Sequence, residues 1–353
     1  MRTFTLLTSY IFLLSISSCK DERKSAAAPL VIASGQMPVI AIDNSGNLNV
    51  VYGTGDSIMC SFSKDNGISF SSPMLIDVLP ELAASHTRGP QIAVSDEAII
   101  VTACNKAGNI FSYTKANTRN WEHAGKVNDV DTVSKEGLMA LSADGPTTFA
   151  VWLDLRDKHN KIFGAKSTDG GKTWSKNIMI YASPDTTVCE CCKPSVAVKD
   201  NNVYVMFRNW LHGSRVLYMI HSSHAGNTFG NAQKLGNGSW ALNGCPMDGG
   251  ALKIDKSGKV FTVWRREGKM FASEPGKQEM EIGEGRSCTM EIVAGRKVYA
   301  WIEKGEVVCL MPDGKKQRLG KGQQPVLKAT TDKQFICVWE NEKKIHRSIL
   351  EIL

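Results

Sequence analysis

The sequence predicts an all-β protein built as a single seven-bladed β-propeller. Its 31 glycines and 8 tryptophans occur without long stretches of 3.6-residue periodicity, a composition that favours strands over helices. A short apolar segment also recurs seven times, starting at residues 38, 90, 137, 194, 250, 289 and 325. The intervals between these starts, 36 to 57 residues, are close to the length of a propeller blade.

The seven segments are predicted to be the first strands of the blades: "PVIAID", "PQIAVS", "GLMALS", "PSVAVK", "GALKID", "TMEIVA" and "PVLKAT". Each is followed by a second, largely apolar strand such as "TTFAVWLD" or "VFTVWRR", the pattern of an inner strand covered on both faces. The seventh repeat stops after a third strand, "KKIHRSILEIL". We expect "PLVIAS", residues 29–34, to supply its fourth strand, so that the two chain ends pair and close the ring. Six blades with a variant closure is the alternative.

The N-terminus has the layout of a secretory signal. Arg2 precedes an apolar run too short to span a bilayer, and small residues stand just before Cys19. The run "ISSC" resembles the bacterial lipobox, and the resemblance implies cleavage before Cys19 and lipidation of its thiol. We therefore expect a signal peptide over residues 1–18, a tether over 19–28 and the propeller over 29–353. The mature protein would be anchored in the bacterial cell envelope without spanning the membrane, facing either the periplasm or the cell surface.

The charge pattern argues against one class of partner. The formal net charge is +7 with both signs mixed along the chain, and no basic run has the interleaved aromatic residues that track nucleic acid. We expect no nucleic-acid binding, and a monomer.

One hairpin motif repeats at blade spacing. The segment "STDGGKTW" combines Ser167, Asp169, Gly171, Thr173 and Trp174, and related strings begin at residues 63, 114 and 222. These segments resemble the Asp boxes of sialidase-type (BNR) propellers. In that superfamily the boxes lie between third and fourth strands, away from the active site, which implies a structural role here.

Ligands of a propeller bind where the loops before the first strands and after the second strands meet over the central channel. Guanidinium groups on these loops suit anions, because they form paired hydrogen bonds with carboxylates. The candidates for anion binding are Arg88, Arg156, Arg208, Arg215, Arg265 and Arg286, with His212 as a possible base or ligand. The alternative for each arginine is an ion pair with a neighbouring acid.

Glycoside hydrolysis needs two positioned carboxylates, or a nucleophile and an acid. The acids on the same loops are Glu136, Asp154, Asp157 and Asp248, and these are the catalytic candidates. The resemblance to sialidases implies an arginine triad, a Tyr–Glu pair and an Asp acid. This chain departs from that pattern, since Gln36 stands at the offset of the first-blade arginine and Arg88 falls one blade later.

The cysteine pattern suggests a second kind of site. Cys60, Cys309 and Cys337 lie within strand patterns and are expected to be buried thiols, whereas five others precede or open the first strands of the fourth, fifth and sixth blades: Cys189, Cys191, Cys192, Cys245 and Cys288. Neighbouring residues of an extended chain point to opposite sides, so Cys191 and Cys192 would need different partners. Either disulfides or a soft-metal site fits this group, and thiolate and thioether ligands would favour Cu(I).

Two functional classes follow from these patterns. The first is a cell-envelope lipoprotein that binds or hydrolyses acidic glycans, or binds another small anionic ligand, at its channel face. The second is a metal-binding or redox propeller that uses the cysteine and methionine cluster.

Overall fold

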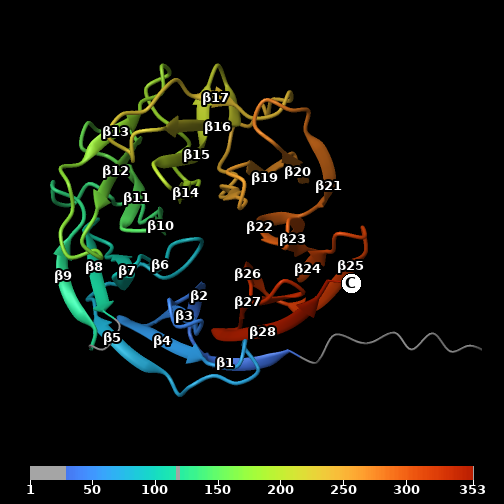
Figure 1. Cartoon of the computed structure of the whole chain (residues 1–353). Helices are drawn as coiled ribbons and strands as arrows, with labels where there is room; N and C mark the ends of the chain where they lie inside the picture. The colour runs from blue at the N-terminus through green and yellow to red at the C-terminus, as the bar shows by residue number, and fades with distance from the viewer. Residues whose placement is uncertain (1–28, 117–119, 353) are drawn as a thin grey trace, which may run out of the picture.

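A computed structural model describes residues 29–116 and 120–352 as seven four-stranded antiparallel sheets arranged in a ring (Figure 1). This confirms the predicted seven-bladed propeller. The predicted signal peptide, the tether and Cys19 lie outside the described residues. Within the described residues, no helix is long and apolar enough to cross a membrane.

The first four blades follow one another along the chain, each running from its innermost to its outermost strand. Blade 1 consists of β2 (Gln36–Ile42), β3 (Leu48–Thr54), β4 (Ser57–Ser63) and β5 (Met74–Val78). Blade 2 consists of β6 (Gln91–Val94), β7 (Ala98–Cys104), β8 (Ile110–Ala116) and β9 (Glu122–Lys126). Blade 3 consists of β10 (Met139–Asp144), β11 (Thr147–Asp154), β12 (Lys161–Ser167) and β13 (Ile178–Tyr181). Blade 4 consists of β14 (Ser195–Lys199), β15 (Asn202–Leu211), β16 (Ser214–Ser222) and β17 (Gln233–Lys234).

The last three blades complete the ring. Blade 5 consists of β18 (Ala251–Ile254), β19 (Val260–Arg266), β20 (Lys269–Ser273) and β21 (Met280–Glu284). Blade 6 consists of β22 (Arg286–Val293), β23 (Arg296–Glu303), β24 (Glu306–Leu310) and β25 (Lys316–Lys321). Blade 7 consists of β26 (Gln323–Ala329), β27 (Gln334–Asn341) and β28 (Lys344–Glu351), with β1 (Leu30–Ser34) as its outer strand.

Pairing of the two chain ends closes the ring, as predicted. Strand β1 lies antiparallel to β28, with Leu30 opposite Arg347 and Ser34 opposite Lys344. The amide of Gly35 adds a hydrogen bond of 2.8 Å to the carbonyl oxygen of Lys343. The outer edge of β28 is therefore paired, and the outermost strand of blade 7 comes from the start of the described chain.

Apolar layers between neighbouring blades form the core. The second strands of blades 3, 5, 6 and 7 each bury a tryptophan, with exposures of 2% or less: Trp152, Trp264, Trp301 and Trp339. Trp339 packs in a cluster with residues of blade 6, such as Val298 and Ala300, and Trp301 packs in a cluster with residues of blade 5. Because each second strand is covered on both faces, its sequence is apolar throughout rather than alternating.

The Asp-box turns connect third and fourth strands. In blade 3, Asp169 accepts hydrogen bonds from the amides of Lys172 (3.1 Å) and Thr173 (3.0 Å) and from the Ser167 hydroxyl (2.8 Å). Gly171 has a φ of 79°, and a Cβ atom at this position would lie 2.7 Å from Ile100 of blade 2. Alternate strands run in opposite directions, so these turns lie at the end of the ring opposite the loops that precede the first strands.

Candidate functional site

A cavity of about 290 Å³ occupies the centre of the ring at the predicted ligand face. All seven blades contribute to its wall through their first strands and the segments just before them. Its polar lining includes Gln91, Lys193, Ser195, Asp248 and Gln324. Its volume is at the lower end of the range for small-ligand pockets. The cavity is therefore the one place in the described chain where all seven blades face a common space.

Lys193 supplies a positive charge to this cavity. Its ammonium group donates a hydrogen bond of 2.7 Å to Oε1 of Gln91, a neutral partner contributed by blade 2. Lys193 is half-buried in the wall, and this burial lowers the pKa of its ammonium group to about 8. Within residues 29–116 and 120–352, no ion pair involves Lys193. The group is thus a cation without a protein counter-charge.

Further charges line the inner strands of blades 5, 6 and 7. Lys253 on β18 forms an ion pair of 2.9 Å with Glu291 on β22. Burial raises the pKa of Glu291, but Lys253 and Lys328 act against this and bring it below its usual value. Burial lowers the pKa of Lys328, which lies on β26. Two lysines and one glutamate give these three inner strands an excess of positive charge, and of the three residues Lys253 lines the cavity itself.

Among the residues that the structure describes, Asp248 is the only acid that lines the cavity. Its side chain is 3% exposed and accepts a hydrogen bond of 2.8 Å from the amide of Ser287. Arg265 lies 4.0 Å from the same carboxylate. Burial raises the pKa of Asp248, although the Ser287 amide and the nearby guanidinium groups oppose the shift. A carboxyl group in this setting is a candidate proton donor.

The predicted arginines fall into two groups: Arg208, Arg265 and Arg286 act electrostatically on Asp248, whereas Arg88 and Arg156 lie elsewhere beside acids of their own. Arg88 pairs with Glu136 at 3.1 Å, and Arg156 pairs with Asp154 at 2.9 Å. Arg208 is 1% exposed, and its guanidinium donates to three backbone carbonyl oxygens, those of Arg215, Asp248 and Arg265. Local protein partners, the alternative given for each arginine, therefore describe Arg88, Arg156 and Arg208.

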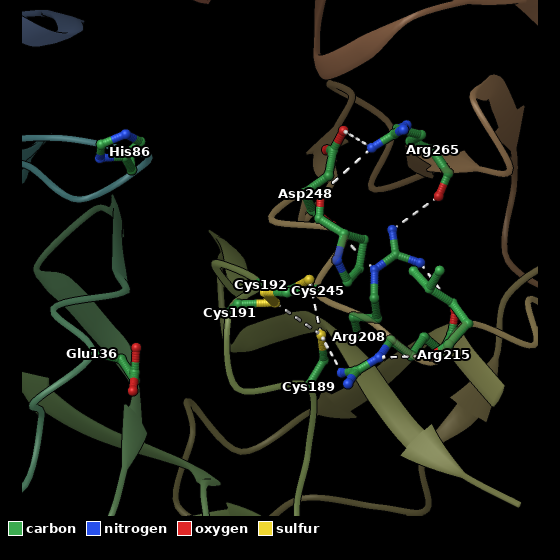
Figure 2. Close-up of a disulfide and its surroundings, with 12 residues drawn as sticks. His86, Glu136, Cys189, Cys191, Cys192, Arg208, Arg215, Cys245, Asp248 and Arg265 are labelled. Carbon is green, nitrogen blue, oxygen red and sulfur yellow. Dashed lines mark hydrogen bonds and ion pairs between the residues drawn. A yellow bond between two sulfur atoms is a disulfide. The ribbon is translucent and has the colours of Figure 1, made fainter. Parts of the chain in front are cut away.

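The remaining catalytic candidates also have local partners. Asp154 is fully buried and accepts from Trp152 as well as Arg156. Asp157 pairs with Lys161 on the surface. His212 has an 84% exposed side chain, 3.8 Å from Asp185. Figure 2 shows Glu136 well apart from Asp248. The structure thus places only Asp248 at the cavity, without a second carboxylate.

Four cysteines gather at the loops before blades 4 and 5 (Figure 2). A disulfide joins Cys191 to Cys245. The Sγ atom of Cys189 lies 3.0 Å from that of Cys192 and 3.8 Å from that of Cys191. Arg215 donates a hydrogen bond of 3.2 Å to the Cys189 sulfur. Of the two alternatives, the disulfide is the one formed by Cys191 and Cys245. The free thiols of Cys189 and Cys192 lie directly beside it.

The other cysteines lie elsewhere. Cys288 is 8% exposed and lines the central cavity, and it is not part of the group of neighbouring sulfur atoms formed by Cys189, Cys191 and Cys192. Cys60, Cys309 and Cys337 are buried in the cores of their blades, as their strand patterns indicated. The methionines expected in the cysteine and methionine cluster were Met247 and Met290. Met247 is 42% exposed, whereas Met290 is fully buried in the layer between blades 5 and 6.

Lys193, Lys253 and Lys328 were not among the predicted site residues, although the sequence carries a signal for two of them. The fourth residue of the first-strand motif is alanine in blades 1 to 4 but lysine in blades 5 and 7, namely Lys253 and Lys328. A charged residue at an otherwise small, apolar position of an inner strand indicates a wall that faces water or a ligand. No comparable signal marked Lys193, which follows two cysteines in a loop.

Known proteins share the fold of this chain without close sequence similarity. No known family model matches the chain, and neither does any curated protein. Among solved structures, the BP39L lectin from Burkholderia pseudomallei is similar over 93% of this chain and 96% of its own, with 10% identity and a TM-score of 0.64.

Two further structures extend the comparison. A PL25 ulvan lyase is similar over 91% of this chain and 95% of its own, with 10% identity and a TM-score of 0.52. The K499G mutant of the NanB sialidase from Streptococcus pneumoniae is similar over 92% of this chain and 70% of its own, with 13% identity and a TM-score of 0.46. The chain thus shares the β-propeller fold with the lectin and the lyase, and identities this low support the fold alone.

Proposed function

We propose that the protein binds an acidic glycan, or another small anionic ligand, in its central cavity. The observation that carries the proposal is Lys193, a half-buried ammonium group in the cavity wall that has no ion-pair partner among the described residues. An anionic group of the ligand would supply that charge and form a charge-assisted hydrogen bond, which is stronger than one between neutral groups. The excess of lysine over glutamate along β18, β22 and β26 favours the same sign of ligand.

The proposal extends to the setting of the protein. The lipobox-like segment before Cys19 supports a lipid-anchored protein of the bacterial cell envelope, where acidic glycans are accessible. Two proteins with this fold are described in carbohydrate terms: one as a lectin, the other as an ulvan lyase bound to a chain that contains GlcA. These descriptions support a carbohydrate ligand as one member of the anionic class.

Binding is better supported than cleavage. Asp248 is the only acid in the cavity wall, and the other three candidate acids have local partners away from it. Hydrolysis by the usual glycosidase route requires a second carboxylate or another nucleophile close to the first. The geometry therefore supports a protein that holds its ligand, with Lys193 as the anchoring charge.

Calorimetric titration with uronate- or sialate-terminated oligosaccharides, compared with neutral ones of equal length, tests this function. Lys193→Gln should weaken binding of the acidic series about tenfold or more, because it removes a charged hydrogen bond. Lys172→Gln makes the same charge change on the Asp-box turn at the other end of the ring and should leave binding unchanged. Equal affinity for acidic and neutral sugars, or an unaffected Lys193→Gln variant, would contradict the proposal. Turnover of a fluorogenic sialoside that is lost in Asp248→Asn would assign hydrolysis instead.

A further inference from the structure

The four sulfur atoms at the loops before blades 4 and 5 form a continuous series. It begins at Cys245, which is exposed, and crosses the disulfide to the half-buried Cys191. From Cys191 the next sulfur, that of Cys189, is 3.8 Å away, and from Cys189 to Cys192 the distance is 3.0 Å. Cys189 and Cys192 are buried, with exposures of 0% and 1%. The series thus connects solvent to the interior.

We propose that this series is a thiol–disulfide relay, in which the Cys191–Cys245 disulfide and the Cys189/Cys192 dithiol exchange their redox states. This inference does not rest on ligand binding at Lys193.

The first step transfers the disulfide inward. The Cys189 thiolate attacks Sγ of Cys191, a Cys189–Cys191 bond forms, and the Cys191–Cys245 bond breaks. The electron pair of the broken bond leaves on Cys245, which takes up a proton from solvent at its exposed position. In this step one disulfide replaces another and no other reactant is consumed.

The second step completes the exchange. The thiol of Cys192 loses its proton and attacks Sγ of Cys189, so that a Cys189–Cys192 disulfide forms and the electron pair leaves on Cys191, which is protonated in turn. Overall, two electrons pass from Cys189 and Cys192 to Cys191 and Cys245, the proton of Cys192 ends on Cys191, and the proton on Cys245 comes from solvent. The exposed Cys245, as its thiolate, would then attack an external disulfide, and Cys191 would displace the resulting mixed disulfide, so that Cys191–Cys245 forms again and the external disulfide leaves as a dithiol carrying the two electrons.

The backbone is already shaped for the inner disulfide. Cys189 and Cys192 have the spacing of a Cys-X-X-Cys pair, and the amide of Cys192 lies 3.4 Å from the carbonyl oxygen of Cys189 in a turn. Such a turn holds the first and fourth Cα atoms within about 7 Å, which is close to the span of a disulfide. The inner bond therefore forms without rearrangement of the blade.

The charges beside Cys189 favour a nucleophile over a bound cation. Arg215 donates to the Cys189 sulfur, and this hydrogen bond stabilises a thiolate. The hydrogen bond from Cys192 lowers the pKa of Cys189 to about 6, burial opposes the shift, and Arg208 and Arg215 assist it. The same two positive charges disfavour a metal cation at these sulfur atoms. Redox exchange therefore fits the group better than a soft-metal site does.

Mass-spectrometric thiol mapping of the whole chain tests the relay. The protein is equilibrated with mixtures of reduced and oxidised dithiothreitol, quenched with acid and labelled at its free thiols. At intermediate mixtures, molecules with a Cys189–Cys192 disulfide and a free Cys245 should appear. The Cys192→Ser variant cannot complete the second step, so its Cys189–Cys191 species should exceed that of the wild type at least tenfold. Cys104→Ser removes a buried thiol of blade 2 and should behave as the wild type does.

Several results would overturn the relay. One is that the Cys191–Cys245 disulfide converts directly to free thiols at every mixture of reduced and oxidised dithiothreitol, and that Cys189 is found in no disulfide in the wild type or in Cys192→Ser. Another is retention of one equivalent of copper or zinc by the reduced protein with Cys189 and Cys192 protected from labelling. If Cys192→Ser fails to fold, Cys245→Ser provides a second test. Mild oxidation of that variant should form Cys189–Cys192 and leave Cys191 free, and three remaining free thiols would count against the relay.

Discussion

The guanidinium group of Arg215 donates a hydrogen bond of 3.2 Å to the sulfur of Cys189. Arg215 lies on β16, while Cys189 lies in the loop before β14, so the contact joins the outer part of blade 4 to its channel end. The Arg215 side chain also stacks on the Trp210 ring, 4.6 Å from its centre. This stacking fixes the guanidinium, so that a positive charge stands permanently beside one thiol among several.

The first prediction concerns the ionisation of Cys189. With its pKa lowered to about 6, the thiol should be deprotonated at neutral pH, unlike an unperturbed cysteine. Arg215→Met removes the hydrogen bond and the charge, and should move the titration to higher pH. The difference in thiolate ultraviolet absorbance between each protein and its Cys189→Ser counterpart measures this titration. Arg318→Met, an exposed arginine on blade 6, serves as the control, and a titration unchanged by Arg215→Met would refute the assignment.

The second prediction concerns the pH dependence of anion binding. Burial lowers the pKa of Lys193 to about 8, so the ammonium is charged below that pH and loses its charge as the pH rises through it. Affinity for an anionic ligand should therefore be full below pH 8 and fall above it, two units earlier than for an ordinary lysine. Lys193→Arg keeps its charge at high pH and should flatten the profile. Titrations across this range would show a constant affinity if Lys193 were not the anchoring charge.

The third prediction concerns the Asp box of blade 3. Asp169→Ala removes the acceptor of two turn amides and two hydroxyl groups, and should lower the free energy of unfolding by about 1–3 kcal/mol. Because the turn lies at the far end of the ring from the cavity, ligand affinity should stay the same. Denaturant unfolding and calorimetric binding on the same preparation measure both quantities. Loss of binding at normal stability would place the Asp box in the ligand site.

The fourth prediction concerns ring closure. Deleting residues 29–34 removes β1 and exposes the backbone edge of β28, so the melting temperature should fall. The point variant Leu30→Ser changes an exposed side chain, keeps the strand, and should melt close to the wild type. A truncated protein that melts with the wild type would show that terminal pairing contributes little.

The sequence predicted the blades because their determinants are local. The apolar first strands, the fully apolar second strands and the Asp-box turns each fix a short segment through its own periodicity or turn chemistry. Even the closure by residues 29–34 followed from counting strands in the seventh repeat. Their arrangement into a seven-membered ring then follows from repetition.

The site was harder to predict because it depends on side-chain directions in irregular loops. The spacing of the cysteines indicated a cluster, but not that Cys191 rather than Cys192 pairs with Cys245. Likewise, the side-chain torsion angles of an arginine decide whether its guanidinium group faces a ligand or pairs with a neighbouring acid, and sequence patterns do not specify these angles. Arg88 and Arg156 pair with Glu136 and Asp154, so the alternative of an ion pair with an acid holds for both arginines, and both acids had also been candidates for catalysis.

The Asp-box turns pack across only some of the interfaces between neighbouring blades. Each such interface is called a seam here, and a turn that packs across it is called a brace. Gly67 of blade 1 packs on Ile336 of blade 7, Gly171 on Ile100 of blade 2, and Gly226 of blade 4 on Phe149 of blade 3. Blades 5, 6 and 7 have no Asp box in their sequence, so the seam between blades 4 and 5 lacks such a brace. That seam is the one that the Cys191–Cys245 disulfide crosses. Reduction should therefore increase amide hydrogen exchange first in β14 and β18, so that the redox state of two loops sets how readily the ring opens on one side.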